Sequence, residues 1–143
     1  MNNKYSSTCI VTIKAPLNKV WDALIKPELV KQYFFGTNLV TTWEVGSPIL
    51  FRGQWEGNSY EDKGIVLSFI TMKSLSYSYW SSFSGISDLP ELYQIVKFSL
   101  EEVNEGVNVT ILQSNVETQE AADNSGQNWN MVLEGLKKML EVN

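Results

Sequence analysis

The chain has 143 residues, of which 43% are hydrophobic and 19% charged, the balance of an ordinary globular domain. We expect a single domain over residues 1–143, long enough to bury a core without a disulfide or metal. The formal net charge is −5, which argues against nucleic acid or an anionic membrane as a partner. There is no histidine, so the commonest general base and metal ligand are missing.

Neither the start of the chain nor its hydropathy indicates export or membrane insertion. Asn2, Asn3 and Lys4 do not lead into an apolar run, and no stretch of about 18 apolar residues occurs. We therefore expect a cytoplasmic protein. Cys9 is the only cysteine. It is expected to be a small buried hydrophobe at the start of a strand, with a reactive thiol as the alternative.

A strand and two short helices are predicted first. Residues 7–14 alternate as a strand, with Cys9, Val11 and Ile13 on one face. Pro16 then suits the first position of a helix. Its apolar residues recur at helical spacing: Leu17, Val20, Trp21 and Leu24. A second helix is predicted from Pro27, with Gly36 as its stop and an apolar side made by Leu29, Val30, Tyr33 and Phe34.

Residues 39–116 have the pattern of an antiparallel sheet of about six strands. The clearest hairpin alternates over 96–100 and 107–111, with a three-residue turn at 104–106 whose glycine allows a positive φ. Tyr77 and Tyr79 alternate with serines, which indicates one aromatic and one polar face. Trp80 cannot share their side unless a bulge intervenes.

The last segment is predicted to be a long amphipathic helix. Its start is open, because Thr118, Asp123 and Ser125 could each cap it. It is the only predicted element long enough to cover the apolar face of the sheet, and a curved sheet around one helix tends to leave a cavity. The fold class is therefore α+β, in the order β-α-α-β6-α. The apolar stripe consists of Trp129, Val132, Leu133, Leu136, Met139 and Leu140.

Four stretches also resemble one known family. They are Ile13-Lys14-Ala15-Pro16 with residues 20–24, Pro27-Glu28-Leu29 with residues 32–34, residues 44–53 with 62–66, and residues 128–140. Together they resemble the START-like (SRPBCC) helix-grip superfamily, and within it the family named after the activator of the ninety-kilodalton heat-shock protein ATPase. The chain departs from the family at Tyr33, where tryptophan is more usual, and at Asn128, where glycine is.

This resemblance implies a helix-grip fold, in which a curved antiparallel sheet wraps a long C-terminal helix. The function we expect is binding of a hydrophobic or aromatic small molecule between sheet and helix. The alternative is a co-chaperone-like module that acts on a heat-shock chaperone ATPase, although 143 residues leave no room for the N-terminal domain of the eukaryotic activators. A cyclase- or dehydratase-type enzyme is a third possibility, with Tyr79 and Glu61 as candidates. We expect no catalytic residue, metal or cofactor.

The expected pocket has a volume of roughly 300–1,000 Å³ and lies against the last helix. Arg52 is expected to be an exposed strand cation paired with an acid such as Glu61, or else the anchor of a ligand carboxylate. The neighbouring acids Glu61 and Asp62 are predicted to be a solvated strand end. The candidate cavity residues are Trp43, Phe51, Trp55, Tyr79, Phe98, Ile111, Gln113, Trp129, Val132, Leu133 and Leu136.

Other aromatic residues are open to two interpretations. Trp21 is expected to anchor the first helix to the sheet, with the cavity mouth as the alternative. Tyr33, Phe34 and Phe35 are expected to close the core, with a mobile aromatic gate as the alternative.

Overall fold

The computed structural model describes residues 4–81 and 84–141. One strand and two short helices precede six further strands and a long helix, so the predicted α+β order is confirmed. The elements are β1 (Tyr5–Ile13), α1 (Leu17–Ile25), α2 (Pro27–Tyr33), β2 (Asn38–Thr41), β3 (Pro48–Trp55), β4 (Asn58–Ile70), β5 (Ser74–Tyr79), the short 3₁₀ helix η1 (Pro90–Leu92), β6 (Gln94–Val103), β7 (Gly106–Val116) and α3 (Gln119–Glu141).

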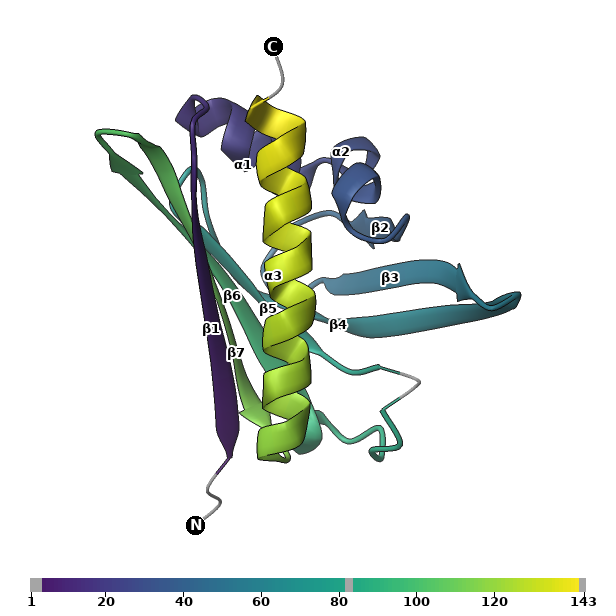
Figure 1. Ribbon diagram of the computed structural model, residues 1–143. Helices are drawn as coiled ribbons and strands as arrows, with labels where there is room; N and C mark the ends of the chain where they lie inside the picture. Colours follow the sequence, from purple (N-terminus) through teal and green to yellow (C-terminus); the bar gives the residue numbers. More distant parts are fainter. Residues whose placement is uncertain (1–3, 82–83, 142–143) are drawn as a thin grey trace.

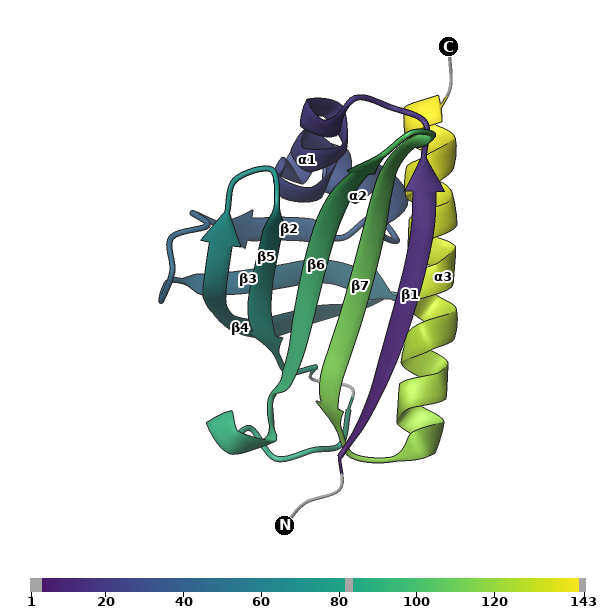
Figure 2. The ribbon, with the colours of Figure 1, turned by 90° about the vertical axis from the view of Figure 1, so that its left-hand side faces the viewer.

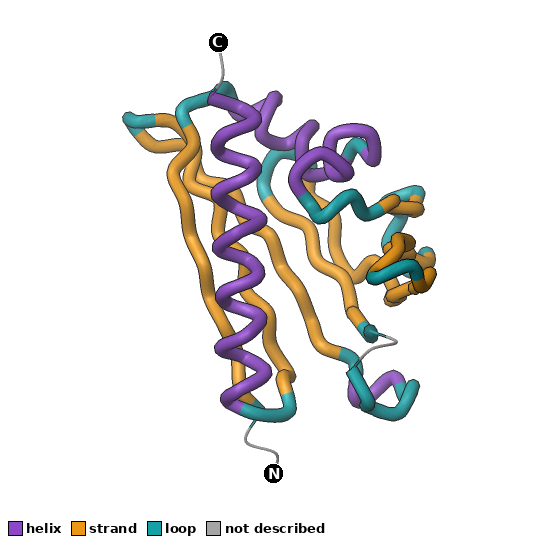
Figure 3. Tube along the Cα trace, turned by 45° about the vertical axis from the view of Figure 1, so that its right-hand side comes forward, coloured by secondary structure: helices purple, strands orange, loops and turns teal. Residues whose placement is uncertain are grey.

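The strands form one seven-stranded antiparallel sheet in the order β1-β7-β6-β5-β4-β3-β2. The sheet curls strongly, so that β1, β6 and β7 run alongside α3 while β3 and β4 turn away from it (Figure 1). The helices α1 and α2 close one end (Figure 3). No helix covers the outer face of β1, β7 and β6 in the described part of the chain (Figure 2).

Strand alternation places the core on the concave face. Val107, Val109 and Ile111 of β7 are at most 1% exposed, whereas Ile10 on the outer side of β1 is 60% exposed. Cys9 is buried and burial raises the pKa of its thiol, so it is the small core residue that was predicted.

The long helix begins where a side chain caps it. The hydroxyl of Thr118 accepts a hydrogen bond from the backbone N–H of Ala121 at 3.0 Å. Of the three candidate caps, Thr118 therefore fixes the start of α3, while Asp123 and Ser125 lie inside the helix. No helix among the described residues is long and apolar enough to cross a membrane.

The short helices are held by aromatic residues. Trp21 of α1 is 2% exposed and its ring lies 5.3 Å from the ring of Phe69 in β4, so it anchors the helix to the sheet as expected. The hydroxyl of Tyr33 donates to the carbonyl oxygen of Ala23 at 2.7 Å and ties α2 to α1. Tyr33 is therefore part of the core closure.

The β6–β7 hairpin differs from the prediction in its turn. Val103 pairs with Gly106, so the loop contains only Asn104 and Glu105 and the glycine is the first residue of β7. Gly106 has φ 145°, and a Cβ there would lie 2.1 Å from the carbonyl oxygen of Ile13. Glycine is therefore required at this position for two reasons, the backbone angle and the close approach of β1.

Candidate functional site

A cavity of about 1010 Å³ lies between the concave face of the sheet, the first half of α3 and the segment that joins α2 to β2. It exists because α3 packs mainly on β1 and β7, which leaves the curled part of the sheet uncovered. The residues around it are Phe34, Phe35, Thr37, Phe51, Gln54, Tyr60, Asp62, Tyr77, Tyr79, Gln113, Ser125, Asn128, Trp129, Met131 and Val132.

Three adjacent strands supply the sheet side of the cavity. Phe51 of β3 is the cross-strand partner of Asp62 in β4, so both side chains stand on the concave face. Tyr77 and Tyr79 alternate along β5 and face the same space. Trp80 lies outside it, with its indole N–H donating to the carbonyl oxygen of Ile86 at 2.9 Å, as the alternation requires.

Aromatic rings form a continuous wall. The Phe51 ring lies 5.3 Å from that of Tyr77 and 5.7 Å from that of Tyr79. Phe34 contacts Phe51 on one side and Trp129 on the other, with centroid separations of 6.2 and 5.5 Å. Phe34 thereby connects the sheet to α3 across one end of the cavity. Such contacts between rings fix the shape of the wall.

One polar pair is set into this wall. The hydroxyl of Tyr79 donates a hydrogen bond to the carboxylate of Asp62 at 2.7 Å. Asp62 is only 7% exposed, so the prediction that it belongs to a solvated strand end is wrong. Burial raises the pKa of Tyr79, and the negative charge of Asp62 raises it further, so the phenol keeps its proton.

A second polar pair joins α3 to the sheet. The indole N–H of Trp129 donates to the side-chain oxygen of Gln113 at 2.6 Å. The amide nitrogen of Gln113 donates in turn to Gln94 on β6. Gln113 is 5% exposed, so the inward orientation expected from Val107, Val109 and Ile111 is observed and both ends of its amide have partners.

The rim combines exposed and fixed aromatic residues. Phe35 is 61% exposed and has φ 55°, an unusual backbone angle for a bulky residue. The ring of Tyr60 lies over Gly53, where a Cβ would come within 2.6 Å of the phenol oxygen. The phenol oxygen of Tyr60 is 3.1 Å from the hydroxyl of Thr37. The rim is therefore tied together between β4 and the α2–β2 segment.

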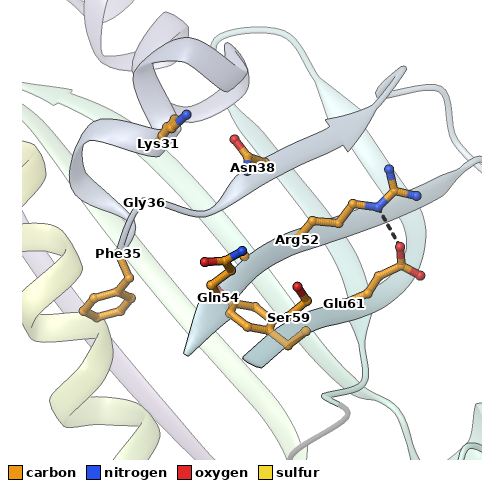
Figure 4. Close-up of a pocket in the computed structure, with 10 residues that line it drawn as sticks. Lys31, Phe35, Gly36, Asn38, Arg52, Gln54, Ser59 and Glu61 are labelled. Carbon is orange, nitrogen blue, oxygen red and sulfur yellow. Dashed lines mark hydrogen bonds and ion pairs between the residues drawn. The ribbon is translucent and has the colours of Figure 1, made fainter. Parts of the chain in front are cut away.

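A second, shallower hollow of about 720 Å³ adjoins this rim on the other side of Phe35 (Figure 4). Arg52 lies in it, and its Nε donates to the carboxylate of Glu61 at 2.6 Å. Both side chains are about half exposed, so Arg52 is the exposed, paired strand cation that alternation from Phe51 predicts. Arg52 does not line the larger cavity, so it cannot anchor the carboxylate of a ligand bound there.

The structure brings together only part of the candidate set. Phe51, Tyr79, Gln113, Trp129 and Val132 line the cavity. Packed in the core instead are Ile111, Leu133 and Leu136, each at most 2% exposed. Phe98 does not line the cavity, and its ring centroid lies 5.6 Å from that of Trp129.

Two tryptophans of the candidate set remain to be placed. Trp43 stacks on Phe69 at 5.5 Å and its indole N–H donates to the carbonyl oxygen of Ile25 at 3.0 Å, so it belongs to the packing around α1. The side chain of Trp55 lies outside the described part of the structure.

Asp62 and Tyr60 are among the cavity residues that the candidate set lacked. The available signal was the alternation of Asp62 with Val66 on β4, since Val66 is fully buried. The adjacent Glu61 masked that signal, because two neighbouring acids resemble an exposed strand end. As an acid–phenol pair, Tyr79 has Asp62 as its partner and not Glu61.

The family model described as activator of Hsp90 ATPase homolog 1-like protein matches residues 14–141. No curated protein matches the chain. The solution structure of ChR145 from Cytophaga hutchinsonii is 45% identical, with 99% of this chain and 97% of that chain covered and a TM-score of 0.84.

Two more distant structures share the fold. The solution structure of the Aha1 dimer from Colwellia psychrerythraea is 22% identical to this chain, with 96% of this chain and 97% of that chain covered and a TM-score of 0.75. Protein MLL2253 from Mesorhizobium loti is also 22% identical, with the same coverage and a TM-score of 0.78. With the fold, the family model and the similarity to ChR145 in agreement, the chain belongs to the activator of Hsp90 ATPase homolog 1-like family.

Proposed function

We propose that this protein binds a small apolar or aromatic molecule in the cavity between the sheet and α3. The observation that supports the proposal is the cavity itself, whose volume of about 1010 Å³ is at the upper end of the usual range for ligand sites. A core that served stability alone would fill such a space, because interiors pack at crystal-like density.

The wall also has the composition of a ligand site. Phe34, Phe51 and Tyr77 line it with aromatic rings. Polar groups held by hydrogen bonds lie in it at the Tyr79–Asp62 pair and at Gln113, and further polar side chains, among them Thr37, Gln54 and Asn128, also line it. Transfer of apolar surface from water to such a wall supplies affinity, and the fixed polar groups orient the ligand.

The opening beside α3 provides a direct test. Asn128 lines the cavity and is exposed, whereas Asn130, two residues further along the helix, is exposed and does not line it. Asn128→Trp should obstruct the cavity, and Asn130→Trp is the matched control with the same change in size and composition. The probe is N-phenyl-1-naphthylamine, a neutral fluorophore whose emission rises in apolar surroundings.

We expect saturable binding of one probe molecule to the native protein. Asn128→Trp should weaken it at least about tenfold, which corresponds to about 1.4 kcal/mol, and Asn130→Trp should leave it within about twofold. Absence of saturable binding, or equal loss in both variants, would contradict the proposal.

A second candidate function is a protein–protein module that acts on a heat-shock chaperone ATPase. Two observations favour it: the family description names an ATPase activator, and the outer face of the sheet is uncovered (Figure 2). Ile10, Leu112 and Ile95 on β1, β7 and β6 are 60%, 37% and 40% exposed there. These three exposed apolar side chains lie among polar ones such as Thr110 and Lys97, and they are the contacts that a protein partner would use.

The test measures ATP hydrolysis by purified Hsp90 with and without this protein. We expect stimulation that Leu112→Glu removes and that Asn128→Trp leaves in place. Unchanged hydrolysis at an excess of this protein would exclude this function.

A further inference from the structure

The charges around the cavity are one-sided. Among the described residues that line it, Asp62 is the one acidic side chain, and none is a lysine or arginine. The basic residues of β3 and β4 are directed elsewhere. Arg52 is paired with Glu61 in the outer hollow, and Lys63 is 2.6 Å from Asp88 and lies over the Trp80 ring.

The surroundings of the carboxylate strengthen its pull on a cation. Asp62 stands opposite Phe51 on the neighbouring strand and accepts a hydrogen bond from Tyr79, so two aromatic side chains border it. The faces of Phe and Tyr rings carry partial negative charge and attract cations. A carboxylate that is largely shielded from water also acts through a lower effective dielectric than an exposed one.

We infer that the cavity selects an apolar or aromatic molecule that carries an amine or another cationic nitrogen, placed against Asp62 and the rings of Phe51 and Tyr79. This inference rests on the proposed function, because it names the chemical class of the ligand for the same cavity. The cation would pair with the carboxylate by a charge-assisted hydrogen bond, while the apolar remainder would lie against Phe34, Tyr77 and Trp129. Carboxylates and phosphates would be disfavoured, since they would meet a like charge with no basic side chain in the described lining.

Three probes with one ring system and different charges test this directly. They are biphenyl-4-methylamine, a cation at pH 7, biphenyl-4-methanol, which is neutral, and biphenyl-4-carboxylate, an anion. Isothermal titration calorimetry with the native protein should give a Kd for the amine at least about tenfold lower than for the alcohol. The carboxylate should bind most weakly.

Two neighbouring substitutions locate the effect. Asp62→Asn should bring the affinities for amine and alcohol within about threefold of each other. Glu61→Gln is the matched control, because it removes one negative charge from the next residue, whose side chain lies in the outer hollow. It should keep the native preference for the amine.

The outcomes separate the two proposals. If the alcohol or the carboxylate binds native protein as tightly as the amine, ligand binding stands and the selection for a cation is overturned. Equal loss of the preference in both variants would overturn the role of Asp62 and reveal a general effect of net charge. If none of the three probes binds, the proposed function fails and this inference fails with it. The comparison on native protein decides even where Asp62→Asn does not fold.

Discussion

The hydrogen bond from Trp129 to Gln113 joins the long helix to the sheet at the edge of the cavity. Gln113→Met keeps the approximate size of the side chain but removes the acceptor, so the indole N–H would be left buried without its partner. We expect the free energy of unfolding to fall by about 1–3 kcal/mol. Urea denaturation followed by circular dichroism measures this change.

A double-mutant cycle isolates the bond from the packing. Trp129→Phe removes the donor. The variant with both substitutions lacks the donor and the acceptor, so neither side chain is left with a polar group that has lost this partner. The combined loss should be smaller than the sum of the single losses by about 0.5–3 kcal/mol. Strictly additive losses would show that the bond contributes nothing beyond side-chain packing.

Individual residues were predictable from the sequence where a strand alternates cleanly. Gln113 follows Val107, Val109 and Ile111 on the buried side of β7, and Phe51 and Arg52 take opposite sides of β3 as expected. Trp43 could not be placed in this way, because it lies in the loop after β2 with φ 63° and its direction depends on that backbone angle. The burial of Asp62 follows the alternation that leads to Val66 on β4, but the adjacent Glu61 conceals that alternation in the sequence.

At the scale of the elements, two glycines occupy opposite situations. In β4, a Cβ on Gly64 would lie 1.6 Å from the carbonyl oxygen of Ser78, so β4 and β5 can pair here only with glycine. In α3, a Cβ on Gly126 would meet only the Cβ of Ser7, at an ordinary 3.7 Å. The same substitution should therefore have opposite effects in the strand and in the helix.

We expect Gly64→Ala to cost more than about 4 kcal/mol or to prevent folding, because the backbone of β5 must move. Gly126→Ala should raise the free energy of unfolding by about 0.5–1 kcal/mol, since alanine favours the helix and restricts the unfolded chain. Thermal and urea unfolding of the two variants measure both effects. A stable Gly64→Ala variant with native cavity binding would contradict this account of the strand pairing.

The elements themselves were largely predictable, and their ends less so. Proline at 16 and 27 and the apolar spacing after each indicated α1 and α2. The start of α3 remained open in the sequence because Thr118, Asp123 and Ser125 have similar capping chemistry, and only the hydrogen bond to the N–H of Ala121 distinguishes them. The predicted turn between β6 and β7 was one residue longer than the observed one, because the pairing of whole strands sets the register.

At the scale of the whole molecule, the cavity follows from where the helix lies. The sequence indicated a helix on a curved sheet, but the same apolar stripe could have lain over the middle strands. Because α3 packs mainly on β1 and β7, Leu133 and Leu136 enter the core while Trp129 and Val132 border open space. Such unfilled volume depends on sheet curvature, which no local pattern in the chain encodes.

Buried tyrosines should make the stability of the whole molecule sensitive to alkaline pH. Burial raises the pKa of Tyr33, Tyr77 and Tyr79 above the ordinary value of about 10, and the charge of Asp62 adds to the effect at Tyr79. Above that pH the unfolded chain releases protons that the folded state retains. Stability is therefore fully present below about pH 10 and falls as pH rises, by about 1.4 kcal/mol per pH unit for each such tyrosine.

Urea unfolding at pH 9, 10 and 11 measures this slope. Tyr33→Phe should reduce the slope above pH 10 by the contribution of one proton, although it loses the hydrogen bond to the carbonyl of Ala23 at every pH. Tyr5→Phe is the control for the removal of one phenol, because the Tyr5 side chain is 40% exposed. Lysine deprotonation is common to all variants and cancels in the comparison. An identical slope in native protein and Tyr33→Phe would mean that this phenol titrates as readily in the folded state as in the unfolded chain.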